Sequence, residues 1–152
     1  MTSPLEALRP LVGVWIERAS FGDDTIEGRA SFEWLGGQEA FLVYRSEMAP
    51  PVPTSLSLIS SDGSGDACLM RYHDSRGVYR EYRTSIRDGE WRITRDDRAG
   101  QRDPRQDGPG FSQRFIGALA RDGKSIDGRW ERSNDGLTWE VDFPLTYTRI
   151  AR

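Results

Sequence analysis

Residues 139–148 read Trp-Glu-Val-Asp-Phe-Pro-Leu-Thr-Tyr-Thr, and this stretch decides the fold class. Apolar and polar residues alternate through it, with a proline on the polar face. Because successive side chains of a β-strand point to opposite faces, the pattern predicts a strand with one buried and one solvated face. The residues predicted to face the interior are Trp139, Val141, Phe143, Leu145 and Tyr147.

The same period of two recurs along the chain from Val14 onward. Short runs rich in aromatic and β-branched residues appear about every ten residues and are separated by turn residues. Asp88-Gly89 and Asp122-Gly123 are two-residue hairpin signals. The predicted strands cover Val14–Phe21, Thr25–Leu35, Glu39–Met48, Ser55–Ser60, Ala67–His73, Val78–Ile86, Glu90–Arg95, Phe111–Ala120, Ser125–Arg132 and Leu137–Arg149.

One helix is predicted, near the start of the chain. Ser3 is placed to cap it, Pro4 suits the first helical position, and Glu6 completes a capping box. Apolar residues follow at helical spacing, and Pro10 keeps the helix short.

About ten antiparallel strands joined by tight hairpins predict an all-β, up-and-down β-barrel, since closure leaves no strand edge exposed. A sandwich of two sheets is the alternative. The 152 residues match the usual length of one domain, so we interpret residues 1–152 as a single barrel domain.

Charge and composition exclude several partners. Lys and Arg number 21 against 24 Asp and Glu, a net charge of -3, so we expect no binding to nucleic acid or to an anionic membrane. The first ten residues lack the basic start and apolar core of a signal peptide, which predicts a cytoplasmic protein. Cys68 is the only cysteine, which excludes an intramolecular disulfide framework and a cysteine-clustered zinc site.

Two segments differ from the strands in composition. The prolines of residues 49–53 predict a stiff extended link, because each proline fixes φ and lacks an N–H group. Residues 97–110 are polar and rich in glycine and proline, which predicts a long loop. Such a loop is either a lid over a site or a plain surface insertion.

The faces predicted to point inward are rich in Trp, Phe and Tyr, with glycines between them. Ten strands leave a wider interior than eight, and a cavity with aromatic walls and a few polar groups is the usual form of a small-molecule site. The alternative is that the aromatic side chains fill a solid core. The predicted ligand-binding residues are Trp34, Tyr44, Met70, Tyr72, Tyr82, Phe115, Trp130, Phe143, Tyr147 and Arg149.

Four segments resemble a known superfamily. Leu11-Val12-Gly13-Val14-Trp15 is similar to the Gly-x-Trp opening of the calycins, which include lipocalins, fatty-acid-binding proteins and nitrobindins. Residues 32–37 (Phe-Glu-Trp-Leu-Gly-Gly), 72–78 (Tyr-His-Asp-Ser-Arg-Gly-Val) and 142–149 (Asp-Phe-Pro-Leu-Thr-Tyr-Thr-Arg) resemble uncharacterised bacterial lipocalin-like proteins. The resemblance covers nearly the whole chain and implies a barrel that binds a small hydrophobic ligand.

The resemblance also raises haem, which nitrobindins hold through a histidine near the C-terminal end. The corresponding residues 143–147 contain no histidine, although Tyr147 is a residue type that ligates ferric haem. We therefore expect neither haem nor another cofactor, and no metal. The only histidine, His73, is either an exposed residue or a general base.

Two Arg and Tyr pairs are candidate anion clamps. Tyr147 and Arg149 share one face of the last strand, and Arg80 and Tyr82 repeat the spacing. Fatty-acid-binding proteins, which the chain resembles, hold a carboxylate with Arg-x-Tyr, the reverse order. An arginine fork beside a phenol makes a charge-assisted clamp. The alternative is that Arg149 extends to solvent at the barrel mouth while Tyr147 bonds a neighbour.

These observations lead to two functional hypotheses. The first is a binding protein for a small hydrophobic molecule, including aromatic or acidic ones. The second is an isomerase or cyclase that works without a cofactor, with Tyr82, Tyr147 and His73 as candidate catalytic residues. A solid barrel that acts only through its surface is a third alternative, and a homodimer is a further prediction.

Overall fold

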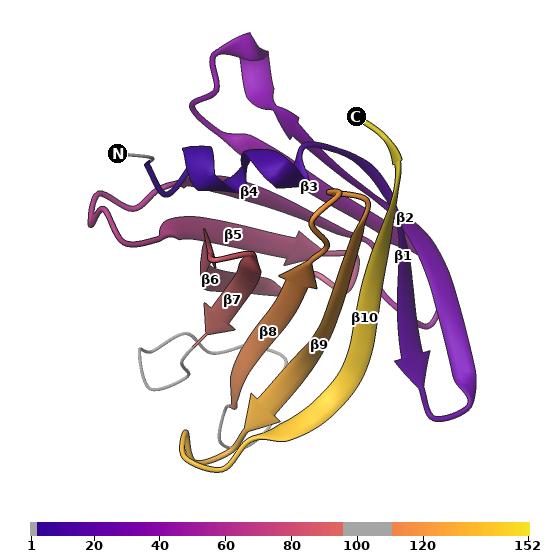
Figure 1. Ribbon diagram of the computed structural model, residues 1–152. Coiled ribbons are helices and arrows are strands. Elements are labelled where there is room, and N and C mark those ends of the chain that lie inside the picture. The colour runs from indigo at the N-terminus through magenta and orange to yellow at the C-terminus, as the bar shows by residue number, and fades with distance from the viewer. Residues whose placement is uncertain (1–2, 96–110) are drawn as a thin grey trace.

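The structure, a computed structural model, describes residues 3–95 and 111–152. In these residues ten strands close into one antiparallel barrel, in which each strand pairs with its sequence neighbours and β1 pairs with β10 (Figure 1). The predicted up-and-down barrel is therefore confirmed. The strands are β1 Gly13–Phe21, β2 Asp24–Trp34, β3 Leu42–Met48, β4 Ser55–Ser61, β5 Cys68–Asp74, β6 Tyr79–Arg87, β7 Glu90–Arg95, β8 Ser112–Leu119, β9 Ser125–Ser133 and β10 Glu140–Ala151.

The hairpins form where turn residues predicted them. Asp88 and Gly89 both adopt positive φ, at 52° and 74°, between β6 and β7. This conformation gives the two-residue turn a twist that matches the right-handed twist of its strands. Between β8 and β9 the turn is longer: the Ala120 N–H donates to the Ser125 carbonyl oxygen at 2.9 Å, and Gly123, at φ 73°, takes the positive φ that this turn requires.

The predicted N-terminal helix exists, but it is a 3₁₀ helix, η1 (Glu6–Leu11), and it includes Pro10. The Ser3 hydroxyl accepts a hydrogen bond from the Glu6 N–H at 3.1 Å, as the capping pattern predicts. Leu8 and Leu11 are fully buried beneath η1. The Trp15 indole N–H donates to the Leu11 carbonyl oxygen at 2.8 Å, so η1 and the start of β1 together close this end of the barrel.

Two predictions for the connections are wrong. The prolines of residues 49–53 do not form an extended link: the Pro50–Pro51 peptide is cis, and the Val52 N–H donates to the Ala49 carbonyl oxygen at 3.1 Å in a tight turn. β3 begins at Leu42 rather than Glu39, because a second short 3₁₀ helix, η2 (Leu35–Gly37), and the positive φ of Glu39 take the chain out of the extended conformation.

The N-terminal part of the last strand also differs from its prediction. Val141 is 56% exposed, and Trp139 lies outside the barrel, where the Arg114 guanidinium is 4.1 Å from its ring centre. The cause is a register shift between Val141 and Phe143, which turns the preceding residues to the outer face. From Phe143 onward the strand follows the predicted alternation.

Aromatic side chains fill the half of the barrel next to η1. Trp91 is fully buried and has Phe115, Tyr147 and Phe32 around it, with ring centres 5.0, 5.5 and 5.7 Å from its own. The Trp91 N–H donates to the Thr84 hydroxyl at 2.9 Å, so the indole is both packed and hydrogen-bonded. This half of the barrel therefore holds the buried aromatic core.

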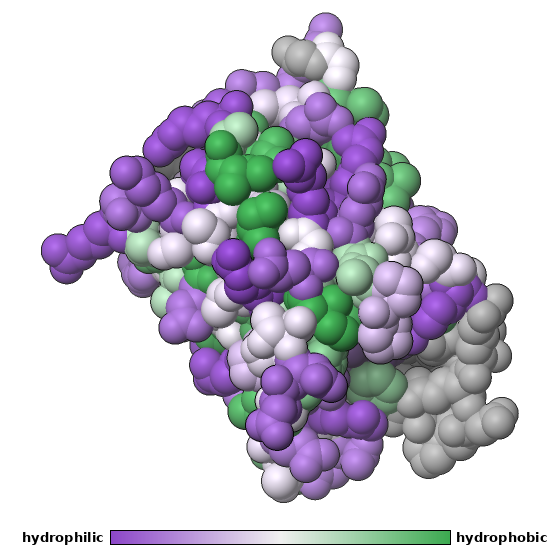
Figure 2. Space-filling view, turned by 90° about the vertical axis from the view of Figure 1, so that its right-hand side faces the viewer, coloured by the Kyte–Doolittle hydropathy of each residue, from purple (hydrophilic) through white to green (hydrophobic). Residues whose placement is uncertain are grey.

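The outer face is mainly hydrophilic. Figure 2 shows apolar side chains in small groups separated by polar ones on the side of the molecule turned toward the viewer. The large hydrophobic side chains that are exposed include Leu56 and Leu58 on β4. Within residues 3–95 and 111–152, helices are too short and too polar to cross a bilayer.

Candidate functional site

A cavity of about 440 Å³ occupies the half of the barrel opposite η1. It is bounded by the inner faces of the strands and by the proline turn between β3 and β4, so this turn forms part of the wall. The loop 97–110, predicted as a lid or an insertion, lies outside the described residues. The described lining residues are Glu17, Ala19, Phe21, Tyr44, Ser46, Met48, Pro51, Val52, Pro53, Ser55, Met70, Tyr72, Arg76, Arg80, Tyr82, Ile93, Phe111, Gln113, Trp130, Asp142, Phe143 and Leu145.

A buried carboxyl group forms part of the cavity wall. Glu17, on β1, is only 2% exposed. One of its oxygens accepts a hydrogen bond from the Tyr44 hydroxyl at 2.8 Å, and the other accepts one from the Ser46 hydroxyl at 2.7 Å. The Tyr147 hydroxyl lies 2.8 Å from that of Tyr44, which extends the network from the cavity into the aromatic core.

Burial dominates the ionisation of this network. It raises the pKa of Glu17 above its usual range, and the hydrogen bonds from Ser46, Tyr44 and Tyr147 offset part of that rise. Burial, together with the nearby Glu17 charge, raises the pKa values of Tyr44 and Tyr147 well above 10. Both phenols therefore stay protonated and remain available as hydrogen-bond donors.

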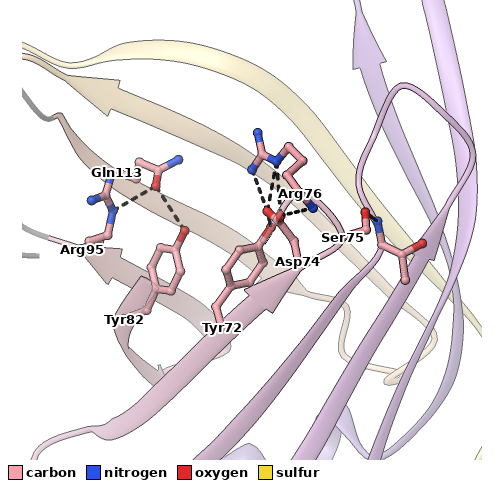
Figure 3. Close-up of polar contacts among 8 residues, drawn as sticks. Tyr72, Asp74, Ser75, Arg76, Tyr82, Arg95 and Gln113 are labelled. Carbon is pink, nitrogen blue, oxygen red and sulfur yellow. Dashed lines mark hydrogen bonds and ion pairs between the residues drawn. The ribbon is translucent and has the colours of Figure 1, made fainter. Parts of the chain in front are cut away.

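A second polar group lies where β5 ends. The Tyr72 hydroxyl donates to the Asp74 carboxylate at 2.6 Å, and the Arg76 guanidinium reaches the same oxygen at 2.6 Å (Figure 3). The Arg76 backbone N–H donates to the other oxygen at 2.9 Å. Burial would raise the pKa of Asp74, but these hydrogen bonds lower it to about 2, so the carboxylate is ionised and its partners are fixed.

A third polar group is built on the neighbouring strands. Gln113, on β8, accepts hydrogen bonds from the Tyr82 hydroxyl and from Nε of Arg95, both at 3.1 Å (Figure 3). Arg95 also donates to the Phe111 carbonyl oxygen at 2.9 Å. The rings of Tyr72 and Tyr82 meet edge to face with centres 5.8 Å apart, so the second and third groups lie side by side on the wall.

Arginine side chains surround the Phe111 ring at the edge of the cavity. The guanidinium carbons of Arg132, Arg95 and Arg80 lie 4.6, 5.0 and 5.9 Å from its centre. These are cation–π distances, and they place positive charge around an aromatic ring at one part of the wall. The cavity thus has an acidic residue on β1 and basic residues around Phe111.

The structure brings together six of the ten residues predicted to bind a ligand, and their role in binding stays a prediction. These six line the cavity: Tyr44, Met70, Tyr72, Tyr82, Trp130 and Phe143. Phe115 and Tyr147 lie in the aromatic core instead. Trp34 lies at the η1 end, where the Arg9 guanidinium is 5.5 Å from its ring centre.

Arg149 and Tyr147 do not form the candidate anion clamp. The Arg149 guanidinium donates to the carbonyl oxygens of Gly123 at 2.9 Å and Val12 at 2.6 Å, and also to that of Pro10. The two residues share a face of β10, as the alternation predicts. Arg149 lies two residues closer to η1, however, and its hydrogen bonds connect the segments at the closed end of the barrel. By contrast, Arg80 and Tyr82 both line the cavity.

His73 lies on the outer face of β5, where it is exposed, and its ring centre is 4.9 Å from that of Tyr79. This position separates it from the cavity. Among the described residues, no group of three or more His, Cys, Asp or Glu side chains is arranged to hold a metal ion.

The sequence interpretation missed the polar residues Glu17, Ser46, Asp74, Arg76, Arg95 and Gln113 and the ring of Phe111. The signal for Glu17 was present, because it lies two residues after Trp15 and two before Ala19 on the inward face of β1. An acidic residue at an inward position of a strand contradicts the usual pattern, and this contradiction is itself a sign of function.

The barrel is similar to solved structures. The crystal structure of Rv2717c from M. tuberculosis matches with a TM-score of 0.67 at 13% sequence identity, covering 97% of each chain. The structure of EF1p2_mFAP2b bound to DFHBI matches with a TM-score of 0.42 at 11% identity, covering 97% of this chain and 100% of that one. No protein-family model and no curated protein matches the sequence. The likeness to Rv2717c shows a shared fold.

Proposed function

We propose that the protein binds a small, largely apolar molecule in the cavity. The observation that carries this proposal is a hollow of about 440 Å³ in a barrel whose other half holds the buried aromatic cluster. This volume lies within the range of roughly 300–1,000 Å³ that is typical of ligand pockets. Met70, Trp130, Phe143 and Leu145 supply apolar wall, and the three polar groups supply orientation.

The Gly13-Val14-Trp15 opening and the ten-strand barrel closed by a short helix support a relationship with the calycin superfamily. Trp15 supports it further, because its indole closes one end of the barrel against η1. In this proposal the closed end provides stability and the opposite end provides the binding site.

The proposal can be tested by filling the cavity. Ala19 lines it and is 1% exposed, so Ala19→Phe places a phenyl ring in the space that a ligand would occupy. Ala118→Phe is the matched control, because Ala118 lies on the exposed outer face of β8. Binding of the neutral probe N-phenyl-1-naphthylamine is followed by its fluorescence, and circular dichroism checks folding.

The expected result is saturable binding to the wild type and to Ala118→Phe, with at least about tenfold weaker binding to Ala19→Phe. A probe that fails to bind the wild type contradicts the proposal. So does a probe that binds a folded Ala19→Phe variant as well as the wild type.

A second candidate function, an isomerase or cyclase that needs no cofactor, is favoured by one observation. The cavity wall holds a buried carboxyl group, Glu17, together with the phenols Tyr44, Tyr72 and Tyr82, which are groups that move or hold protons. With a candidate substrate in hand, turnover that is unchanged in both Glu17→Gln and Tyr82→Phe would exclude this function.

A further inference from the structure

Glu17 is a buried acid that has no cationic partner among the described residues. Ion pairs in the described part of the chain do not include Glu17, and its hydrogen-bond donors, Tyr44 and Ser46, are neutral. Gly28 lies beside it on β2 and contributes no side chain. Burying a carboxylate is costly unless it is paired, so an isolated acid on a cavity wall marks a place where a ligand supplies the missing charge.

The hydrogen bonds around Glu17 arrange it as an acceptor. When Tyr44 donates to Glu17, its oxygen is free to accept the proton of Tyr147, 2.8 Å away. Ser46 donates to the other carboxyl oxygen. All three hydroxyl protons then point along the network toward the carboxyl group, an arrangement that stabilises its ionised form.

The carboxylate keeps unused acceptor capacity, and Glu17 is one of the residues that line the cavity. An ionised carboxylate offers roughly four acceptor sites; Tyr44 and Ser46 use one on each oxygen, and Tyr147 also lies close enough to hydrogen-bond the carboxyl group, which leaves at least one site. A ligand group that occupies the remaining sites must be a donor. A protonated amine is the best match, because it brings both hydrogen bonds and the opposite charge.

The walls next to Glu17 also suit a cation. The aromatic rings of Tyr44, Tyr82 and Trp130 line the same cavity, and aromatic faces attract ammonium groups. Two basic residues line the same cavity: Arg76 donates to Asp74 and is thereby partly neutralised, and the Arg80 guanidinium lies 5.9 Å from the centre of the Phe111 ring.

We propose that the cavity selects molecules with an apolar body and a terminal ammonium group that donates to Glu17. The inference rests on the proposed binding function and names the ligand class. The hydrogen bonds from Tyr147 to Tyr44 and from Tyr44 to Glu17 favour the ionised carboxylate, and this carboxylate distinguishes an ammonium group from a neutral or anionic one.

The test uses three probes with one common body: 4-phenylbutylamine, 4-phenylbutan-1-ol and 4-phenylbutanoate. Their affinities are measured by calorimetry at about pH 7, where the amine is protonated, with the wild type, Glu17→Gln and Glu47→Gln. Glu47, on the exposed outer face of β3, is the matched control, since its substitution makes the same chemical change away from the cavity. Circular dichroism and thermal melting check that each variant is folded.

The expected result is that the wild type binds the amine roughly ten- to a hundredfold more tightly than the alcohol, and the acid most weakly. Glu17→Gln should lose this preference while it keeps its affinity for the alcohol, and Glu47→Gln should retain the preference. Equal binding of amine and alcohol to the wild type overturns the inference but leaves the proposed binding function standing. The inference is likewise overturned if the wild type binds 4-phenylbutanoate more tightly than the amine, or if Glu17→Gln still prefers the amine to the alcohol. In both cases the proposed binding function stands. If N-phenyl-1-naphthylamine and all three probes fail to bind, the proposed function itself fails.

A pH series gives an independent readout. Tyr44 on β3 and Tyr147 on β10 are the titratable groups that contact or extend this network, and both stay protonated over the series. Amine affinity should therefore fall as the pH is lowered through the raised pKa of Glu17, while alcohol affinity stays constant. An affinity for 4-phenylbutylamine that stays constant as the pH is lowered from about 7 to the usual carboxyl pKa of 4.5 contradicts the assignment to Glu17.

Discussion

The Arg149 guanidinium lies over the indole ring of Trp15, with its central carbon 4.1 Å from the ring centre. Trp15 and Arg149 are also direct partners in the pairing of β1 with β10. Since Arg149 donates to carbonyl oxygens before β1 and in the β8–β9 turn, one side chain joins three parts of the closed end.

Replacing Arg149 should therefore reduce stability without changing the cavity. Arg149→Ala removes three hydrogen bonds from a charged donor, two of them part-buried, and the contact with Trp15, so we expect a loss of about 2–4 kcal/mol in the free energy of unfolding. Arg149→Lys should recover only part of it, since a lysine lacks the planar fork. Urea denaturation measures the loss, and Arg29→Ala on the exposed outer face of β2 is the control. A weakened probe affinity in folded Arg149→Ala would contradict the placement of this residue outside the site.

The buried acid predicts an unusual dependence of stability on pH. Because the pKa of Glu17 is higher in the folded state than its usual 4.5, the folded protein binds this proton more tightly than the unfolded chain. The contribution of Glu17 to stability is then present below about pH 4.5 and is lost as the pH rises through the folded pKa. Glu17→Gln lacks this titration, so its melting temperature relative to wild type should increase as the pH rises. A constant difference from pH 4 to about pH 8 would show that the carboxyl group titrates normally.

Asp74 predicts the opposite trend. Its pKa of about 2 lies below the usual 3.8, so its contribution to stability is present above about pH 3.8 and is lost as the pH falls through about 2. Asp74→Asn should cost about 1–2 kcal/mol at neutral pH, a value reduced by the solvent exposure of Arg76. Denaturant melts of variant and wild type should converge toward low pH. If the two curves stay parallel down to about pH 2, the ionised form of Asp74 is not the stabilising one.

A glycine pair beneath the Phe115 ring predicts a steric effect. Gly117 and Gly128 face each other in β8 and β9, and a methyl group on Gly128 would meet the ring at 2.5 Å and the Ile116 carbonyl oxygen at 3.0 Å. Because Phe115 is fully buried, it has no room to move, and Gly128→Ala should cost about 1–3 kcal/mol. The penalty should be smaller in a Phe115→Leu background. An equal penalty in both backgrounds would assign the effect to the backbone rather than to the ring.

The local features of the fold were predictable from sequence because local chemistry produces them. Asp88-Gly89 specifies a hairpin through the φ angles that its turn requires, and the alternation in residues 143–149 specifies which face is buried. The register shift before Phe143 was not predictable, because it depends on how β10 pairs with β9. The turn at Pro50–Pro51 likewise depends on a cis peptide that the residue types permit but do not require.

The site was predictable only in part, because alternation gives the face of a residue and not its depth along the barrel axis. Tyr82 and Arg149 were both predicted to face inward, but one lines the cavity and the other holds the closed end. Depth depends on strand tilt and stagger, which are properties of the whole barrel. Glu17 was identifiable by its position between Trp15 and Ala19, but only the structure shows that Tyr44 and Ser46 converge on it.

The pairing of β1 with β10 has a consequence for how the protein is made. Val14 and Ala151 are partners although most of the sequence separates them, and contacts between such distant positions form slowly. A nascent chain emerging from the ribosome therefore carries nine strands with two open edges until residues 140–151 arrive. Until then Arg149 is not in place over the Trp15 ring, and the unpaired edges of β1 and β9 make this the stage at which the chain is most prone to aggregate.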